Sequence, residues 1–384
     1  MNDKNTNINE EYLEIFQQLI CEQLARAELL KEGSSFTDYA QADKITVGII
    51  PGDGIGPVIM TETVNVLEKL LADEIKSGKI ELRPIAGLTL ENRVATGETV
   101  PKVVLAAIKE CDVLLKGPTT TPDKNSGLPN LESANVTLRK ELDLFANVRP
   151  VSIPELGIDW TFYRENTEGE YSLGSKGIVI SDDLSVDFKV TTTAGTERIA
   201  RAAFEFAKAN GKSRVSIVTK ANIMKKTDGK FLDLCYRVAK DYPDIKTDDW
   251  YVDIMAANLV NPDIRADFQV FVLPNLYGDI ITDEAAQIQG GVGTAGSANV
   301  GAKYAMFEAI HGSAPRMVRD GIADKANPAS IMKAAVMLLR HIGMAEKAAK
   351  LDSAVNLASE SLNMSGTADG NSAADFSAIV MKHL

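Results

Sequence analysis

The sequence predicts an α/β protein with a mostly parallel core sheet, and three observations support this fold class. From residue 45 onward, short runs of β-branched and aliphatic residues alternate with helix-like patterns. The runs at 45–50, 112–115, 215–219 and 269–273 are typical of buried strands, and residues 57–75 form an amphipathic helical pattern. The length of 384 residues allows two domains, and a content of 45% hydrophobic and 24% charged residues is that of a globular protein.

Residues 1–44 are predicted to form a helical extension. Apolar side chains recur there at helical spacing, at Tyr12, Ile15, Phe16, Leu19, Ile20 and Leu24. The helix is expected to stop at 32–35, where a glycine and two serines follow Glu32. Such a helix either packs on its own chain or contacts a partner subunit, and the sequence leaves both possibilities open.

The first predicted strand runs into a glycine-rich loop, "GIIPGDGIGP". Its glycines, Gly52, Gly54 and Gly56, have the spacing G-x-G-x-G, whereas a dinucleotide fingerprint needs G-x-G-x-x-G. Pro57 stands in the place of the third fingerprint glycine, and Asp53 would repel a phosphate. The loop is therefore interpreted as a structural turn beside a site.

Two acidic residues four positions apart are candidate metal ligands. Asp279 and Asp283 lie in "YGDIITDEAAQ" and share one face if a helix begins there. Oxygen ligands without a nearby histidine or cysteine favour Mg²⁺ or Mn²⁺ over zinc. Taken alone, such a pair is more often a helix start stabilised by the helix dipole.

Cationic side chains form a second candidate set. Arg139, Arg149 and Arg164 flank apolar segments, and the guanidinium fork matches carboxylate or phosphate groups. Lys220 ends a predicted buried strand, where desolvation can lower the pKa of an amine into the range of a general base. Singly, each arginine is more often part of a surface ion pair, and a lysine at a strand end often extends its amine into solvent.

Composition limits the function classes. The net charge of −12 argues against nucleic acid or an anionic membrane as a partner. Cys21, Cys111 and Cys235 are widely spaced, which indicates neither a disulfide framework nor a zinc site. No apolar stretch is long enough to span a membrane, and the N-terminus lacks the core of a signal peptide. We expect a cytoplasmic protein.

Eight ordered motifs resemble the isocitrate/3-isopropylmalate dehydrogenases. They are "GIIPGDGIGP", "KGPTTTP", "SANVTLRKELDLFANVRP", "YRENTEGEY", "TKANIMKKTDG", "NLYGDIITDEAAQIQGGVG", "FEAIHGSAP" and "ANPAS". The resemblance implies the two-domain α/β fold of that family, which is not a Rossmann fold. It places the large domain at 45–144 and 290–384, and the small dimerisation domain at 145–289 with a short clasp at about 171–194. Residues 1–44 lie outside it.

The resemblance also implies roles for individual residues. Arg139, Arg149 and Arg164 match positions that clamp substrate carboxylates, and Ser133 and Asn135 match the pair that recognises the third carboxylate side of isocitrate. Tyr171 and Lys220 match the catalytic residues, and Asp253 joins Asp279 and Asp283 as ligands of Mg²⁺ or Mn²⁺. Nucleotide-binding positions are matched by Thr121, Asn222, Glu308, His311, Gly312, Ser313, Ala314 and Asn327.

The implied reaction is the NAD(P)-dependent oxidative decarboxylation of isocitrate to 2-oxoglutarate and CO₂. Ser133 and Asn135 favour isocitrate, because their polar groups would be left unpaired by the isopropyl group of 3-isopropylmalate. Family members that take 3-isopropylmalate carry an apolar residue at the position of Ser133. Homoisocitrate, tartrate and 3-isopropylmalate stay open as substrates. A non-catalytic regulatory subunit is the other alternative, but such subunits usually lose the lysine, the tyrosine or the metal aspartates, which are all present here.

The cofactor and the assembly follow from the same resemblance. Arg316 suits a 2′-phosphate and favours NADP⁺, whereas the C-terminal "GTADGNSAADFSAIV" resembles the NAD-type ending, so NAD⁺ is expected with NADP⁺ as the alternative. In the family, the residues matching Lys220 and Asp253 reach into the partner's active site. A homodimer or higher homo-oligomer with shared sites is therefore expected.

Overall fold

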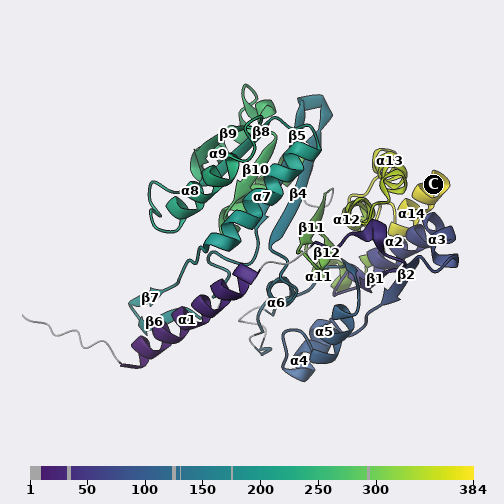
Figure 1. Ribbon diagram of the computed structural model, residues 1–384. Coiled ribbons are helices and arrows are strands. Elements are labelled where there is room, and N and C mark those ends of the chain that lie inside the picture. The colour runs from purple at the N-terminus through teal and green to yellow at the C-terminus, as the bar shows by residue number, and fades with distance from the viewer. Residues whose placement is uncertain (1–9, 33–35, 123–126, 130, 174–175, 292–294) are drawn as a thin grey trace, which may run out of the picture.

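A ten-stranded mixed sheet forms the backbone of the computed structural model, which describes residues 10–32, 36–122, 127–129, 131–173, 176–291 and 295–384 (Figure 1). The strand order is β2-β1-β3-β12-β11-β4-β5-β10-β8-β9. The strands are β1 (Ile45–Ile50), β2 (Ile80–Pro84), β3 (Val113–Lys116), β4 (Ala146–Ile153), β5 (Ile158–Glu165), β8 (Arg214–Thr219), β9 (Lys246–Tyr251), β10 (Val270–Leu273), β11 (Gly296–Val300) and β12 (Ala305–Ala309). The four strands predicted from sequence are confirmed.

The sheet is parallel on both flanks and antiparallel in the middle. β2, β1, β3 and β12 pair in parallel, as do β5, β10, β8 and β9. The central pairs β12–β11, β11–β4 and β4–β5 are antiparallel. Short connections close the pairs β4–β5 and β11–β12, and such connections permit only antiparallel neighbours. The predicted parallel character therefore holds for the flanks, while the centre differs.

Helices cover both halves of the sheet and build separate cores. The helices beside the first half are α2 (Gly56–Leu70), α3 (Ala72–Lys76), α4 (Leu90–Thr96), α5 (Lys102–Lys109), α6 (Ala134–Glu141), α11 (Pro315–Arg319), α12 (Ala329–His341), α13 (Ala345–Ser361) and α14 (Ala373–Lys382). Beside the second half are α7 (Thr193–Ala209), α8 (Asp228–Ala239), α9 (Val252–Val260) and α10 (Asn275–Gln289). One apolar cluster forms around α2, α12 and α13 in the first half of the sheet. Another forms around α7 and α8 in the second half. The domain boundaries at 144/145 and 289/290 stay a prediction.

The N-terminal helix α1 (Glu10–Leu29) packs on its own chain, along the hairpin of β6 (Ile178–Ser181) and β7 (Leu184–Val186) (Figure 1). Phe16 contacts Phe188 at a ring-centroid distance of 5.6 Å, and Leu19 is buried. A second stripe of α1, with Leu13 and Leu24, is exposed. The helix was predicted to stop at 32–35; α1 ends at Leu29 and a 3₁₀ turn covers Leu30–Glu32, while residues 33–35 lie outside the described residues. Within the described chain, no helix combines the length and apolarity that a membrane crossing needs.

The loop "GIIPGDGIGP" is a structural turn, as predicted. Gly52 and Gly54 have φ values of 75° and 62°, and a Cβ on Gly54 would lie 1.9 Å from the carbonyl oxygen of Ser313. The buried Asp53 carboxylate accepts hydrogen bonds from the backbone N–H groups of Leu90 and Thr120, each at 2.7 Å. The loop therefore braces the segments that follow β3 and β12.

Strand pairing also places opposite charges inside the protein. In the parallel pair β3–β12, Lys116 lies opposite Glu308, and the Lys116 amine donates to the Glu308 carboxylate at 3.2 Å. Asn299 donates to the same carboxylate at 2.7 Å, and Arg139 approaches it at 3.4 Å. Burial by itself raises the pKa of Glu308, but the charges of Lys116 and Arg139 outweigh burial and lower it to about 2. Glu308 therefore stays ionised in the core.

The Glu308→Gln variant should lose about 3 kcal/mol of unfolding free energy at neutral pH, because Lys116 and Arg139 are left buried without their carboxylate. The native pKa lies below the unfolded value, so this stabilisation is complete above about pH 5 and declines as the pH falls toward about 2. The difference in unfolding free energy between the wild type and the variant should therefore become smaller as the pH falls. Urea unfolding between neutral pH and about pH 4 measures both effects. Glu141→Gln, which alters a half-exposed ion pair with Lys109, is the control, and an equally stable Glu308→Gln protein would contradict the account.

Candidate active site

A pocket of about 310 Å³ opens where α6, α10 and the central strands meet. Much of its wall comes from the segments that follow the parallel strands β3, β10 and β12. Open α/β sheets bind ligands at this end of their strands. Its lining consists of Pro118, Thr119, Ser133, Asn135, Val136, Arg139, Arg149, Arg164, Tyr171, Asp279, Asp283, Ser297, Glu308, Ala309, Ile310, His311 and Gly312. Eleven residues predicted from sequence are thus brought together, although they span 180 positions of the chain.

The three predicted arginines converge on this pocket and are all buried. Arg139 comes from α6, Arg149 from β4 and Arg164 from β5, where Arg164 is 1% exposed. Burial, followed by the charge of Arg139, lowers the pKa of Arg164 to about 10. The Nε atoms of Arg139 and Arg149 are buried and have no hydrogen-bond partner among the described residues. A polyanionic ligand would satisfy these donors.

Two aspartates on one face of α10 balance the arginines. Asp279 accepts from Arg164 and Asp283 accepts from Arg149 at 2.8 Å. Burial tends to raise the pKa of Asp279, but Arg164, Tyr171 and Arg149 reverse that effect and lower it. The two carboxylates present oxygen ligands one helical turn apart, which fits Mg²⁺ or Mn²⁺. Nowhere in the described chain do three His, Cys, Asp or Glu side chains converge closely enough to hold a metal.

Tyr171 lies directly beside this charge cluster. Its hydroxyl donates to Asp279 at 2.8 Å, and the Arg164 guanidinium lies 5.3 Å from the centre of its ring. Burial and the charge of Asp279 both raise the pKa of Tyr171. The phenol therefore keeps its proton at neutral pH and can deliver it to a reacting atom.

The start of α6 presents two neutral polar groups to the same pocket. Ser133 occupies the N-cap position, but its hydroxyl makes no capping hydrogen bond to the described backbone. Asn135 accepts from the hydroxyl of Thr119 at 3.1 Å. The Ser133 hydroxyl therefore has no capping hydrogen bond that would compete with a ligand.

Lys220 and Asp253 pair with each other outside the pocket. The Lys220 amine lies 2.5 Å from the Asp253 carboxylate, between the end of β8 and the start of α9. The Lys220 side chain is 26% exposed and that of Asp253 is 60% exposed, so the desolvation expected for Lys220 is only partial. Asn222, two residues further on, is exposed. None of the three lines the pocket within the described part of this subunit.

The predicted nucleotide loop follows β12 and enters the pocket with its first residues. His311 and Gly312 line the pocket, and His311 Nε2 is buried with no partner in the described chain. Burial lowers the pKa of His311, so its ring is neutral and offers one donor and one acceptor. Ser313 shares a hydrogen bond of 2.6 Å with Thr120, and Ala314 has a left-handed φ of 44°, a strained conformation for alanine.

Of the remaining predicted nucleotide residues, Thr121, Arg316 and Asn327 lie outside the described pocket wall. Arg316 is on the outside of α11, 84% exposed, and its Nε donates to Asp320 at 3.4 Å. The Asn327 side chain accepts from the backbone of Ala329 at 2.9 Å, and Thr121 is exposed. Glu308 lines the pocket, but its contacts with Lys116, Arg139 and Asn299 give it a structural part as well.

Three residues were missed by sequence reasoning. Thr119 lines the pocket in place of Thr121 and belongs to the same "KGPTTTP" motif, which was the available signal. Lys116 opens that motif and is the buried partner of Glu308. Asn275 accepts two hydrogen bonds from Arg164, at 3.0 and 2.7 Å, and fixes its direction. Asn275 opens the motif "NLYGDIITDEAAQIQGGVG", which was the available signal, but nothing in the sequence showed that it contacts Arg164.

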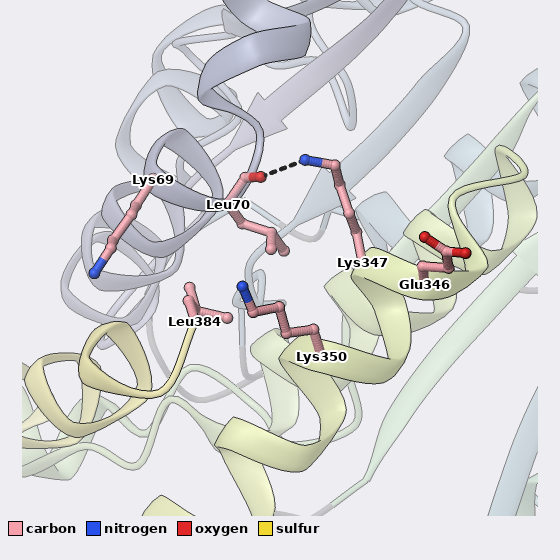
Figure 2. Close-up of a pocket in the computed structure, with 6 residues that line it drawn as sticks. All are labelled: Lys69, Leu70, Glu346, Lys347, Lys350 and Leu384. Atoms are coloured by element: carbon pink, nitrogen blue, oxygen red, sulfur yellow. Dashed lines mark hydrogen bonds between the residues drawn. The ribbon is translucent and has the colours of Figure 1, made fainter.

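A second hollow lies at the far end of the first half of the sheet, between α2, α13 and the C-terminus (Figure 2). Lys69, Lys347 and Lys350 surround it, and Figure 2 shows the Lys347 amine directed at the carbonyl of Leu70, to which it donates at 2.8 Å. Lys69 donates likewise to the carbonyl of Met381. These cations are partly engaged and mostly exposed, so the hollow does not compete with the arginine pocket as a candidate active site.

Comparisons with known proteins agree with this geometry. The NAD isocitrate dehydrogenase subunit alpha from mitochondria of Macaca fascicularis is 39% identical over 317 residues, which are 80% of this chain and 86% of the relative. A mitochondrial regulatory subunit of the NAD isocitrate dehydrogenase of Dictyostelium discoideum is 39% identical over 322 residues, covering 81% of this chain and 82% of the relative.

A solved structure and a family profile extend the likeness to the fold. The isocitrate dehydrogenase of Methylococcus capsulatus superposes with a TM-score of 0.76 at 34% identity, covering 88% of this chain and 99% of that one. The profile of the family described as isocitrate/isopropylmalate dehydrogenase matches residues 46–378. The chain therefore belongs to the isocitrate/isopropylmalate dehydrogenase family, and within it the chain is most like isocitrate dehydrogenases.

Proposed function

We propose that this protein catalyses the oxidative decarboxylation of isocitrate to 2-oxoglutarate and CO₂, with NAD⁺ and Mg²⁺ or Mn²⁺. The observation that carries the proposal is the convergence of three buried arginines, two aspartates and Tyr171 on one pocket. A tricarboxylate with a hydroxyl group needs this combination, because its carboxylates require cations and its hydroxyl requires a Lewis acid. The names of the relatives support the same reaction.

Substrate recognition is assigned to the arginines and to the start of α6. Arg139, Arg149 and Arg164 hold carboxylates, with the Nε atoms of Arg139 and Arg149, which have no partner among the described residues, as donors. The hydroxyl of Ser133, which makes no capping hydrogen bond to the described backbone, and the amide of Asn135 hold the third carboxylate side. An isopropyl group would leave these polar atoms unpaired, so isocitrate is preferred over 3-isopropylmalate.

Asp279 and Asp283 would hold the metal together with Asp253 of the partner subunit. A bound cation would supply a Lewis acid for the oxygen on the carbon that is oxidised. NAD⁺ would supply the hydride acceptor, and His311 and Gly312 are the pocket residues assigned to it. NADP⁺ is the second candidate. Arg316 is exposed and forms a weak ion pair with Asp320, so its guanidinium can pair with the 2′-phosphate of NADP⁺ instead.

Two side chains move protons in this proposal. Lys220 of the partner subunit takes the hydroxyl proton, and Asp253 beside it stabilises the resulting ammonium. Tyr171 gives its proton to the carbon that CO₂ leaves, which its raised pKa permits. The arginines keep the carboxylates oriented throughout.

Shared active sites explain why Lys220 and Asp253 lie apart from the pocket of their own subunit. Ile223 and Ile254 lie close to them in the chain and Ile280 lies on α10, at 65%, 44% and 57% exposure, and a partner subunit would cover such exposed apolar side chains. A homodimer satisfies this requirement. A heteromer is the alternative, since the relatives are named as alpha and regulatory subunits. The cytoplasmic location stays a prediction, and both of these relatives are mitochondrial.

The purified protein with isocitrate and Mg²⁺ should reduce NAD⁺, and more slowly NADP⁺, as an absorbance increase at 340 nm. EDTA should abolish the increase, because Asp279 and Asp283 alone provide no Lewis acid. Homoisocitrate, tartrate and 3-isopropylmalate are assayed in parallel under the same Mg²⁺ concentration. Reduction of neither cofactor with isocitrate rejects the proposal, and faster turnover of another acid reassigns the substrate.

Mixed dimers test whether the active site is shared. Lys220→Met and Tyr171→Phe homodimers should both be inactive, since each lacks one proton-transfer group in every site. Unfolding and refolding them together in equal amounts should restore about a quarter of wild-type activity, because half of the dimers carry one intact site. Refolded single variants are the controls. Activity that does not rise on mixing would mean that Lys220 serves its own subunit or no site at all.

A further inference from the structure

The N-terminal helix α1 places an arginine against the segment that connects two residues of the candidate site. Arg26 Nη1 donates to the Glu168 carboxylate at 2.9 Å, and Arg26 Nη2 donates to the Thr167 hydroxyl at 3.0 Å. Glu168 is 3% exposed, so this is a nearly buried ion pair rather than a surface contact. The helix lies outside residues 46–378, which the family profile matches. The contact is therefore an addition made by this chain's own extension.

We propose that Arg26 is a positioning residue of the active site and that α1 acts through it on substrate binding by Arg164. This inference rests on the proposed function. It assigns a task to residues 10–29, for which the sequence left own-chain packing and partner contact open.

The segment held by Arg26 is short, buried and internally bonded. It begins at Glu165, the last residue of β5, and Arg164 directly precedes it. The Glu165 carboxylate accepts from the Thr167 backbone N–H at 2.9 Å and from the Glu168 backbone N–H at 2.6 Å. Two carboxylates three residues apart are thus buried together, which is costly unless a cation is close. Arg26 supplies that cation to Glu168.

From this segment, a continuous series of hydrogen bonds leads to the substrate pocket. The Glu168 carbonyl accepts from the side-chain amide of Asn275 at 3.0 Å. The oxygen of that amide accepts from Arg164 Nε and Nη2 at 3.0 and 2.7 Å. Arg164 in turn donates to Asp279, which also accepts from Tyr171. A displacement of Glu168 therefore rotates Asn275 and removes the support that fixes Arg164.

Other contacts of α1 go to the clasp hairpin and miss this series. The Tyr12 hydroxyl donates to the Ile180 carbonyl at 3.1 Å, and Glu22 pairs with Lys176 at 2.7 Å. These contacts dock the helix without touching residues 164–168. They provide a matched control, because their loss weakens the docking of α1 while Arg26 stays in place.

The experiment compares Arg26→Ala and Arg26→Lys with Glu22→Gln in the full-length protein. We expect Arg26→Ala to raise the KM for isocitrate about tenfold, since the buried Glu168 carboxylate then keeps its hydrogen bonds from Thr192 but loses its cation, which shifts the loop that follows Arg164. The KM for NAD⁺ should stay unchanged. Arg26→Lys, which keeps the charge but not the fork, should give an intermediate KM, and Glu22→Gln should match wild type. If all four proteins share one KM for isocitrate, or if Glu22→Gln equals Arg26→Ala, the inference is overturned.

Hydrogen–deuterium exchange separates this inference from the proposed function, because it requires no substrate. Amides of residues 164–171 should exchange faster in Arg26→Ala than in wild type, while those of the distant helix α13 should not change. Faster exchange supports the inference even if the wild-type enzyme prefers another acid. Exchange in 164–171 that is equal in Arg26→Ala and wild type contradicts it, whatever the substrate.

Discussion

The balance of charge inside one pocket is the constraint on which the rest of this structure depends. Three buried arginines repel one another, and the charge of Arg139 is a cause of the lowered pKa of Arg164. Without a ligand, Asp279, Asp283 and Glu308 offset that repulsion by accepting from the guanidinium groups. The arginines are therefore paired with carboxylates of the protein itself when the pocket holds no ligand.

The fold supplies this balance by placing distant segments at one edge. Parallel pairing of β3 with β12 sets Lys116 opposite Glu308, and antiparallel pairing of β4 with β5 brings Arg149 and Arg164 to the same region. The glycine turn at 52–56 then holds the segments after β3 and β12 at close range through Asp53 and the carbonyl of Ser313. Close backbone approach, rather than phosphate binding, is what those glycines permit.

Much of the fold and part of the site could be predicted from sequence. Buried strands such as 45–50 and 269–273 follow from runs of β-branched and aliphatic residues, and the helix on which Asp279 and Asp283 would share a face, stated only as a condition, is present as α10. The antiparallel centre of the sheet was not predicted, because none of β4, β5, β11 and β12 was among the strand-like runs identified, and the pairing of β11 with β4 joins segments far apart in the chain. The same limit hid Asn275 and Arg26, whose partners Arg164 and Glu168 are more than 100 residues away. Thr121 was chosen over Thr119 because only the fold decides which of them faces the pocket.

The central claim is that substrate carboxylates and a divalent cation replace the arginine–aspartate pairs together. Calorimetric titration of isocitrate into the protein, with EDTA or with a fixed concentration of free Mg²⁺, tests it most directly. Mg²⁺ should take Asp279 and Asp283 and release Arg164 and Arg149 for the substrate, so the Kd for isocitrate should fall by about tenfold or more. Equal Kd values with and without Mg²⁺ would contradict the account.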